Sequence, residues 1–460
     1  SGSGVTVENG NITITSAGSY IISGTLTDGS IKVNCSEKGT VRLILNGASI
    51  SSSSTAPVVV KEAKKVLVTL ADGTTNIITD KTRQSVDDED FSSAVYSKAD
   101  LVFNGSGTLN VNAGYRNGIK STDDLKVVSG TFNITSNDGV HCNGDILISG
   151  GNLTISSGDD GIHADDNLQV DGGTIDIKKC CEGLEGVQIT LNDGDISIVA
   201  SDDGINAADG SSSSGMGMGG FGGGQNGGFG GGQASSSDSS VLLTINGGNI
   251  FVNAGGDGLD SNGNIVMNGG NVTVLGPTSD GDTALDFDGA FTINGGVLMA
   301  FGSSGMLETP TSAQNGCCIV TTLGTVSANS EFSLMDSSGN VIMSYTPTKN
   351  YASAIVYSSD IKNGSTYTVT AGSTTQSITV NSNVTTNGVS GGFGGGQNGG
   401  FGGGQRGGQP GGSAPDGNGS FGDGQQGGKQ QGGNQQGGMP GGNSGNGRSN
   451  SASSSTANQV

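Results

Sequence analysis

The sequence contains no tryptophan, only two histidines, and 19 basic residues against 41 aspartates and glutamates. The resulting net charge of −22 argues against nucleic acid as a partner, because binding to a phosphate backbone depends on lysine and arginine. No apolar run approaches the roughly 20 residues of a membrane-spanning helix. We therefore expect a protein without a membrane span that prefers cations or weakly charged partners.

Cysteine is also scarce, and the six that occur do not have the spacing of a disulfide framework. Two pairs are adjacent in sequence, Cys180–Cys181 and Cys317–Cys318, and there is no C-x-x-C motif. We expect Cys142 to be a buried thiol, because it falls in a row of small residues described below. Whether the adjacent pairs form vicinal disulfides stays open.

Glycine is abundant, with 88 residues, and many of these glycines belong to an internal repeat. The first five copies place their central glycines 21, 22, 22 and 21 residues apart. Each unit also has a glycine turn followed by alternating apolar and polar residues, as in "GGNLTIS", which predicts short strands with one buried face. The copies are "NGIKS" at Gly118, "DGVHC" at Gly139, "DGIHA" at Gly161, "EGLEG" at Gly183, "DGINA" at Gly204, "DGLDS" at Gly258 and a degenerate "TALDF" at 283–287.

Units of this length with neither fixed leucines nor a helical half predict an all-β fold, a parallel β-helix. We assign residues 1–310 to this solenoid, with a glycine-rich loop inserted at 211–240. Longer alternating segments predict a small antiparallel β cap over 311–387, and the Gly/Gln-rich tail at 388–460 should be disordered. A tract at 219–233 recurs unchanged at 391–405. These Gly/Phe/Gln tracts are either flexible spacers or contacts for self-association.

Aligned on the repeat glycine, the units predict which side chains point into the solenoid. Successive turns lie about 4.8 Å apart, so equivalent residues stack into rows. The residue after the glycine is apolar and the residue two further on is mostly small, so both should face inward. The row between them should face outward and contains Lys120, His141, His163, Glu185, Asn206, Asp260 and Asp286. The row before the glycine should be exposed and contains Asn117, Asp138, Asp160, Glu182, Asp203 and Asp257.

These two rows, called the acidic rows below, bring carboxylates close together on successive turns. Like charges about 5 Å apart repel by roughly 3 kcal/mol per pair at an effective dielectric constant of about 20. A bound cation would offset this repulsion, and several oxygen ligands on flexible turns suit calcium better than zinc or magnesium. The predicted calcium ligands are Asp138, Asp159, Asp160, Asp165, Glu182, Glu185, Asp202, Asp203, Asp257 and Asp260. The alternative is that each Asp-Gly pair only supplies a turn.

Three basic side chains beside the acids allow further interpretations. The rings of His141 and His163 should be neighbours and either stack, as an exposed pair without a catalytic role, or share a transition metal. Lys120 is either an ordinary surface lysine or a base that abstracts a proton from a uronic acid beside calcium.

Several motifs, in their order along the chain, resemble those of a bacterial calcium-binding, carbohydrate-binding β-helix family. This family is related in fold to calcium-dependent polysaccharide lyases. They are "SGTLTDGSIKV", "VRLILNGASI", "VLVTLADGTTNIITD", "LVFNGSGTLNV" and "NGIKSTDDLKVVSGTFNIT", followed by the DG repeats, and the resemblance covers about residues 5–385. It implies a right-handed parallel β-helix, bound calcium, and a secreted or cell-surface location. It also implies binding to plant-type polysaccharides such as cellulose-like or pectic chains. Lyase activity does not follow from it. Lys120 and Arg116 are the candidate bases close to the acidic rows, but no motif fixes either in that role.

Aromatic residues, which often stack on sugars, are few. Five of the 13 phenylalanines lie in glycine-rich tracts, and Phe91, Tyr96 and Tyr115 are the remaining candidates near the acidic rows. Calcium bridging to an acidic polysaccharide is physically easier than stacking on flat cellulose. The sequence therefore predicts a non-catalytic, calcium-dependent polysaccharide-binding protein of the cell surface. A calcium-dependent lyase and a filament or adhesin subunit are the alternatives.

Overall fold

The computed structural model describes residues 4–37, 39–81, 92–209 and 240–389. The chain divides into two units, 1–397 and 398–460, and only the first contains described residues. Most of the inserted tract, nearly all of the predicted tail, and Phe91 therefore lie outside the described residues. The described residues form strands connected by turns, and none of them forms a helix that could cross a membrane.

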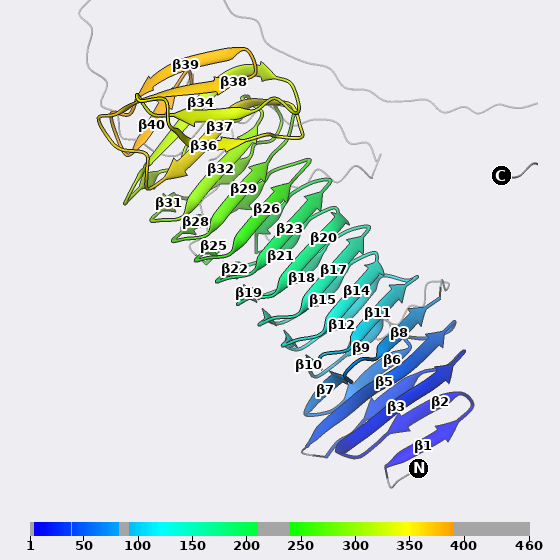
Figure 1. Cartoon of the computed structure of the whole chain (residues 1–460). Coiled ribbons are helices and arrows are strands. Elements are labelled where there is room, and N and C mark those ends of the chain that lie inside the picture. The colour runs from blue at the N-terminus through cyan, green and yellow to red at the C-terminus, as the bar shows by residue number, and fades with distance from the viewer. Residues whose placement is uncertain (1–3, 38, 82–91, 210–239, 390–460) are drawn as a thin grey trace, which may run out of the picture. The chain divides into compact units, whose positions relative to one another are not determined.

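The first unit contains a parallel β-solenoid, as predicted. It has about eleven turns, and Figure 1 shows them stacked along one axis. Each turn contributes one strand to a first sheet, and these strands pair in parallel. At the N-terminal end, β1 (Val5–Glu8) pairs antiparallel with β2. The strands of the first sheet are β2 (Asn11–Ile14), β4 (Ile31–Asn34), β6 (Val58–Glu62), β9 (Ser93–Ser97), β12 (Asn117–Ser121), β15 (Val140–Cys142), β18 (Ile162–Ala164), β21 (Leu184–Gly186), β24 (Ile205–Ala207), β27 (Leu259–Ser261) and β30 (Leu285–Phe287).

A second sheet receives two strands per turn from β7 onward, again in parallel register between turns. It begins with the long strands β3 (Gly18–Leu26) and β5 (Thr40–Ser52). The paired strands that follow are β7 (Lys65–Leu70) and β8 (Thr75–Asp80), β10 (Asp100–Gly105) and β11 (Thr108–Ala113), β13 (Leu125–Val127) and β14 (Thr131–Ser136), β16 (Ile146–Ile148) and β17 (Asn152–Ser157), β19 (Asn167–Val170) and β20 (Thr174–Cys180), β22 (Gln188–Leu191) and β23 (Asp195–Ala200), β25 (Leu242–Ile245) and β26 (Asn249–Asn253), β28 (Asn264–Met267) and β29 (Asn271–Leu275), and β31 (Phe291–Ile293) and β32 (Val297–Gly302).

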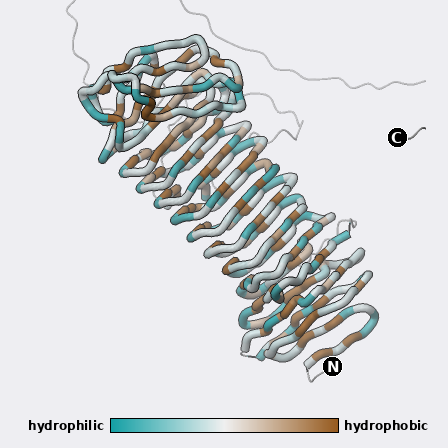
Figure 2. Tube along the Cα trace, viewed as in Figure 1, coloured by the Kyte–Doolittle hydropathy of each residue, from teal (hydrophilic) through white to brown (hydrophobic). Residues whose placement is uncertain are grey.

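The core is a narrow stack of Ile, Val, Leu and Phe enclosed between these strands. Apolar and polar residues alternate along the strands, so one side of each strand is buried (Figure 2). The apolar row after the repeat glycine is buried as predicted, from Ile119 through Leu259 to Leu285. The small row also faces the core, and the Cys142 thiol is fully buried there. Each buried aliphatic side chain stabilises the fold by about 1.5–3 kcal/mol.

The repeat glycines are required by close packing between turns. A Cβ on Gly139 would lie 2.3 Å from the carbonyl oxygen of Gly161 and 2.7 Å from Ile155. None of the six repeat glycines has a left-handed backbone. Close packing therefore explains the glycine at these positions, and the interpretation that each Asp-Gly pair only supplies a turn stays open. Left-handed glycines occur in the other turn of each unit, as at Gly151 and Gly173.

An antiparallel unit follows the last turns of the solenoid (Figure 1). The short β33 (Ser312–Ala313) still pairs in parallel with β31. In contrast, β37 (Tyr351–Ser358) pairs antiparallel with both β32 and β34 (Cys317–Val326). The last strand, β40 (Val384–Asn387), lies beside β34. A small separate sheet contains β35 (Phe332–Met335), β36 (Val341–Tyr345), β38 (Thr366–Ala371) and β39 (Thr374–Thr379). The predicted hairpin at "DSSGN" joins β35 to β36. Pairing with β37 covers the edge that β32 would otherwise expose.

Candidate functional site

The outward row of the first sheet has the predicted register. Neighbouring turns pair Lys120 with His141, His141 with His163 and His163 with Glu185. The row continues through Asn206 and Asp260 to Asp286. Parallel pairing therefore places these seven side chains on seven successive turns, one above another.

The row before the glycine is aligned by backbone hydrogen bonds between turns. The amide of Gly139 donates to the carbonyl of Asp160 at 2.8 Å, and the amide of Gly161 donates to the carbonyl of Glu182 at the same distance. Gly183 and Asp203 repeat the contact at 3.0 Å. The acids are only partly exposed, in contrast to the exposed row that we expected. Side chains stacked on both adjacent turns cover them.

Burial makes the negative charge of the acids unfavourable at the C-terminal end of the acidic rows. It raises the pKa of Asp260 to about 9, with the nearby charge of Asp286 adding to the effect. Burial also raises the pKa values of Asp203 and Asp257 to about 7. Backbone amides offset part of this cost, because Asp203 Oδ1 accepts from the Asp257 amide at 2.7 Å and Asp257 Oδ1 accepts from the Thr283 amide at 2.6 Å. These groups favour a proton or a cation at neutral pH.

The middle of the site is organised around His163. Its Nδ1 lies 3.3 Å from Asp160 Oδ2 and 3.1 Å from Glu185 Oε2. Its Nε2 lies 3.5 Å from Asp165 Oδ1, which is also 3.1 Å from His141 Nε2. The two imidazole rings are tilted neighbours with centroids 4.6 Å apart. Neither is freely exposed, so the expectation of an exposed pair is wrong, because acids on the adjacent turns cover the rings.

The environments of the two histidines shift their pKa values in opposite directions. Burial lowers the pKa of His141 to about 4, and the positive charges of Lys120 and His163 act in the same direction. Burial also disfavours the charge of His163, but the hydrogen bond to Asp160 and the charges of Glu185 and Asp165 outweigh it and raise its pKa. A protonated His163 therefore neutralises part of the acidic rows from within the protein.

Two overlapping groups around His163 have the geometry to hold a metal ion, with ligand atoms within 4.8 Å of one another. One contains His141, His163 and Asp165, and the other contains Asp160, His163 and Glu185. The sequence led us to expect oxygen ligands alone, whereas each of these groups includes imidazole nitrogen. A third group, Asp100, Asp123 and Asp124, lies on earlier turns and outside the predicted ligand set.

Asn206 provides an amide oxygen that fits a cation. Its Nδ2 donates to Glu182 Oε2 at 3.0 Å, whereas its Oδ1 is buried and has no hydrogen-bond partner among the described residues. Its position in the outward row lies between Glu185 and Asp260. Amide and carboxylate oxygens together form the ligand set that calcium prefers, so the residues present fit a calcium ion. Asn206 lies in β24 and was in the predicted outward row, but it was not among the predicted ligands.

The structure brings some of the ten predicted ligands together and leaves others at the margin. Asp160, Asp165 and Glu185 lie in the groups around His163. Glu182 contacts Asn206, and the pKa of Asp260 is raised first by burial and then by the charges of Asp286, Asp203 and Asp257. Asp138 lies at the N-terminal margin, where burial and then Asp160 raise its pKa. Asp159 and Asp202 are exposed.

Two acids at the C-terminal end were absent from the predicted ligands. Asp286 continues the outward row, and burial raises its pKa. Glu308 Oε2 accepts from the Phe287 amide at 3.2 Å, and burial followed by the charge of Asp286 raises its pKa to about 8. Asp286 could have been found from its place in the degenerate repeat. Glu308 lies beyond the last repeat, so no periodic signal marks it.

The remaining predicted residues lie at the N-terminal end of the site. Lys120 is in register between Tyr96 and His141, and Arg116 places its guanidinium carbon 5.6 Å from the centroid of the Tyr115 ring. Tyr96 is 3% exposed, so it cannot stack on a sugar. The Tyr115 ring is partly exposed beside Arg116.

The fold and the acidic rows define a parallel β-solenoid with a candidate cation site on one face. Comparison with known proteins gives the family: a sequence model described as "Carbohydrate-binding domain-containing protein" matches residues 8–282. The chain belongs to this family.

A relative with the same description, from Acetivibrio thermocellus, is 35% identical over 134 residues. The match covers 28% of this chain and 47% of the relative, so the chain spans about half the length of the curated relative. A solved structure titled as a polysaccharide lyase-like protein from C. thermocellum, a gadolinium derivative, aligns with a TM-score of 0.41 and 24% identity. That alignment covers 63% of this chain and 90% of the other.

Proposed function

We propose that this protein is a non-catalytic, calcium-dependent polysaccharide-binding protein and that the acidic rows form its calcium site. The ligands we favour are acidic chains of the pectic, polyuronate type, with cellulose-like chains as the alternative. The proposal includes an extracellular or cell-surface location, where such chains occur.

One observation carries the proposal: Glu185 and Asp260, half-buried acids with raised pKa values, lie on the turns on either side of Asn206, whose amide oxygen Oδ1 has no partner among the described residues. A buried acceptor without a donor costs about 1–3 kcal/mol, and stacked carboxylates add repulsion. A divalent cation relieves both costs. Nitrogen ligands would favour zinc or copper near His163, but the group around Asn206 offers oxygen only.

The chemistry of a polyuronate matches a surface of this kind. Its carboxylates would be repelled by the protein alone, whose net charge is −22. A calcium ion held by the acidic rows supplies the positive charge that joins two anions. In this arrangement the ion is held by Glu182, Asp203, Asp260 and Asn206. The successive turns of the solenoid offer further acidic side chains along the direction of the polysaccharide chain.

Titration calorimetry of the full chain with calcium, and then with polygalacturonate with and without chelator, tests the proposal. We expect stoichiometric calcium binding, and polysaccharide binding that the chelator abolishes. Asp260→Asn and Asn206→Ala should each weaken calcium at least about tenfold, since each removes an oxygen ligand or its charge. Asp193→Asn is the matched control, because Asp193 is an exposed acid in the turn between β22 and β23 of the second sheet. Calcium-independent binding, or no metal in elemental analysis, would contradict the proposal.

A calcium-dependent lyase is the second candidate function, and it is favoured by one observation. The Lys120 ammonium group lies in the same outward row as the acids, one turn from His141. In this reaction a base removes the proton on the carbon beside the uronate carboxyl group, and the bond from the neighbouring carbon to the glycosidic oxygen breaks. The released oxygen takes up a proton from water, and a carbon–carbon double bond forms in the uronate ring, which gives an unsaturated product. Incubation with polygalacturonate and calcium should then produce the absorbance of that product, and Lys120→Met should abolish it. The non-catalytic proposal expects no such absorbance.

A further inference from the structure

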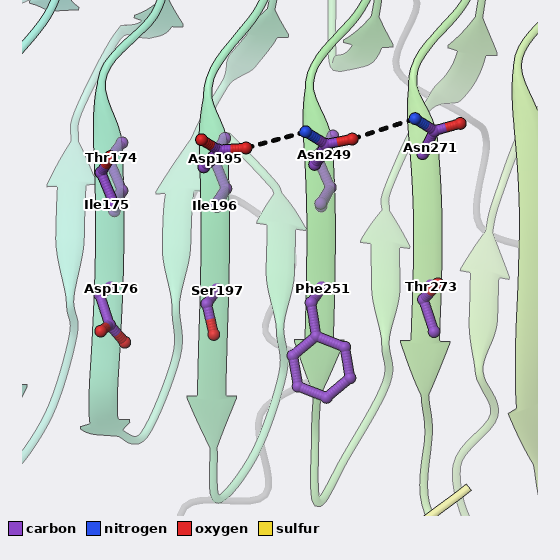
Figure 3. A pocket seen from close by; sticks show the side chains of 11 residues that line it. Thr174, Ile175, Asp176, Asp195, Ile196, Ser197, Asn249, Phe251, Asn271 and Thr273 are labelled. Carbon is purple, nitrogen blue, oxygen red and sulfur yellow. Dashed lines mark hydrogen bonds between the residues drawn. The ribbon is translucent and has the colours of Figure 1, made fainter. Parts of the chain in front are cut away.

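A hollow of about 380 Å³ lies on the second sheet (Figure 3), whereas the acidic rows belong to the first. This volume is within the range of about 300–1,000 Å³ that is common for small-molecule sites. The hollow is lined by residues of β20, β23, β26 and β29 alone, which makes it a depression on an open sheet. The lining residues are Thr174, Ile175, Asp176, Asp195, Ile196, Ser197, Asn249, Ile250, Phe251, Asn271 and Thr273.

The ring of Phe251 lines this hollow. Parallel register places Phe251 between Ser197 and Thr273, with Asp176 one strand further along the same row. Figure 3 shows the ring spread over β26, flanked by the side chains of these neighbours. An aromatic ring is therefore bordered by hydroxyl and carboxylate groups within one row of side chains.

A second row of polar side chains runs along the hollow and is held in place by hydrogen bonds between strands. Asn249 Nδ2 donates to Asp195 Oδ1 at 2.8 Å, and Asn271 Nδ2 donates to Asn249 Oδ1 at 3.0 Å (Figure 3). These contacts fix the orientation of the amides before any ligand binds. Fixed polar groups lose little conformational entropy on binding.

We propose that this hollow is a carbohydrate subsite for neutral sugar rings, with Phe251 as the stacking platform. A pyranose ring has one apolar face of C–H groups and a rim of hydroxyls. The Phe251 ring matches the apolar face, and the row of Asp195, Asn249 and Asn271 offers acceptors and donors to the rim. Because the depression lies on an open sheet, it accepts an internal segment of a chain.

Charge decides between neutral and acidic sugars. The lining includes the carboxylates of Asp176 and Asp195, and none of the lining residues is basic. The ammonium group of Lys178 forms an ion pair with Asp176 at 2.5 Å. A uronate would be repelled by the carboxylate of Asp195, whereas the hydroxyls of a neutral sugar can donate to both carboxylates. The subsite therefore differs in ligand class from the acidic rows and does not depend on calcium.

Phe251 also packs against the apolar cluster that contains Leu275 and Phe301. A variant must therefore separate the packing of this side chain from its stacking on a ligand. Phe251→Leu keeps an apolar side chain of similar volume but removes the flat ring. Phe251→Tyr keeps the ring.

Titration calorimetry of the full chain with cellohexaose, xylohexaose and mannohexaose, in the presence of chelator, tests the proposal. We expect the wild-type protein to bind at least one of them. Phe251→Ala and Phe251→Leu should weaken binding about tenfold, and Phe251→Tyr should retain it. Thr154→Ala is the matched control, because Thr154 lies in the same row next to Asp176 but outside the lining. Hexagalacturonate should not bind under these conditions.

Three results would contradict the proposed subsite. They are no binding of any neutral hexasaccharide by the wild-type protein, binding that Phe251→Leu leaves unchanged, or binding that Thr154→Ala weakens as much. Asp260→Asn distinguishes the two proposals, because it should reduce calcium and polygalacturonate binding and leave neutral oligosaccharide binding unchanged. A failure at Phe251 would therefore not affect the calcium proposal, and the reverse also holds.

Discussion

The Asp257 amide donates to the carboxylate of Asp203 at 2.7 Å, although the two residues are 54 positions apart in sequence. The preceding repeat glycines are 21 or 22 residues apart, so one solenoid turn is interrupted between these acids. Parallel pairing of β24 with β27 keeps the register across the interruption, with Asn206 opposite Asp260. The acidic rows are therefore continuous from the N-terminal to the C-terminal side of the inserted segment.

We predict that the metal-free protein loses stability as pH rises from about 4 to about 9. Burial raises the pKa values of Asp203 and Asp257 to about 7 and that of Asp260 to about 9, while the unfolded values lie near 4. The folded state therefore binds more protons in this window, so the free energy of unfolding falls with pH. Thermal melting in chelator should show a lower Tm near pH 8 than near pH 5.

Calcium should reverse this trend, because metal binding competes with protons for the same carboxylates. The increase in Tm on adding calcium should be large near pH 8 and small near pH 5. Asp260→Asn should raise the Tm of the metal-free protein near pH 8 and reduce the gain from calcium. A Tm that is the same with calcium and with chelator at both pH values would contradict a metal site in the acidic rows.

The two histidines should titrate far apart in NMR spectra of the metal-free protein. We expect His141 near pH 4 and His163 above its ordinary value of 6.5. The contribution of His163 to stability is then present below pH 6.5 and lost as pH rises through its folded pKa. That of His141 is present above pH 6.5 and lost as pH falls toward 4.

A variant can check that the two rings interact. His163→Gln removes a positive charge beside His141. It also leaves His141 as the only histidine in contact with Asp165, so the pKa of His141 should rise. It should stay below 6.5, because burial is the largest cause of its shift. An unchanged His141 titration would contradict the coupling.

The rows could be predicted from the sequence because strand pairing in a parallel solenoid has a constant spacing. Once the repeat glycines were aligned, the register of His141 with His163 followed directly, and the structure confirms it. Burial and contacts between turns could not be predicted in the same way. The unpartnered oxygen of Asn206 and the contact of Glu308 with Phe287 depend on how side chains on different turns pack. The role proposed for Phe251 could not be predicted either, because its neighbours in the row lie on other strands and are known only from the strand pairing.

The repeat glycines should tolerate substitution poorly, although their backbone geometry is ordinary. A Cβ on Gly183 would lie 2.2 Å from the carbonyl oxygen of Gly204 and 2.5 Å from Ile198. Gly183→Ala should therefore destabilise the solenoid by about 1–3 kcal/mol, measured as a lower Tm in calorimetry. Gly281→Ala is the control, since a Cβ there has nothing within 4 Å. If both variants melt alike, close packing is not the reason for glycine in the repeat.

Lys349 should hold the antiparallel C-terminal unit onto the solenoid. This residue lies between β36 and β37, and its ammonium group donates to the carbonyls of Ala254 and Leu275, which belong to solenoid turns. Lys349→Met leaves both carbonyls without this donor, and hydrogen bonds from a charged group contribute about 1.5–3 kcal/mol. We expect faster hydrogen–deuterium exchange in β35, β36 and β38, with exchange in β14 and β17 unchanged. Lys362→Met is the control, because Lys362 donates to Ser359 within the same unit, and equal acceleration in both variants would contradict the role assigned to Lys349.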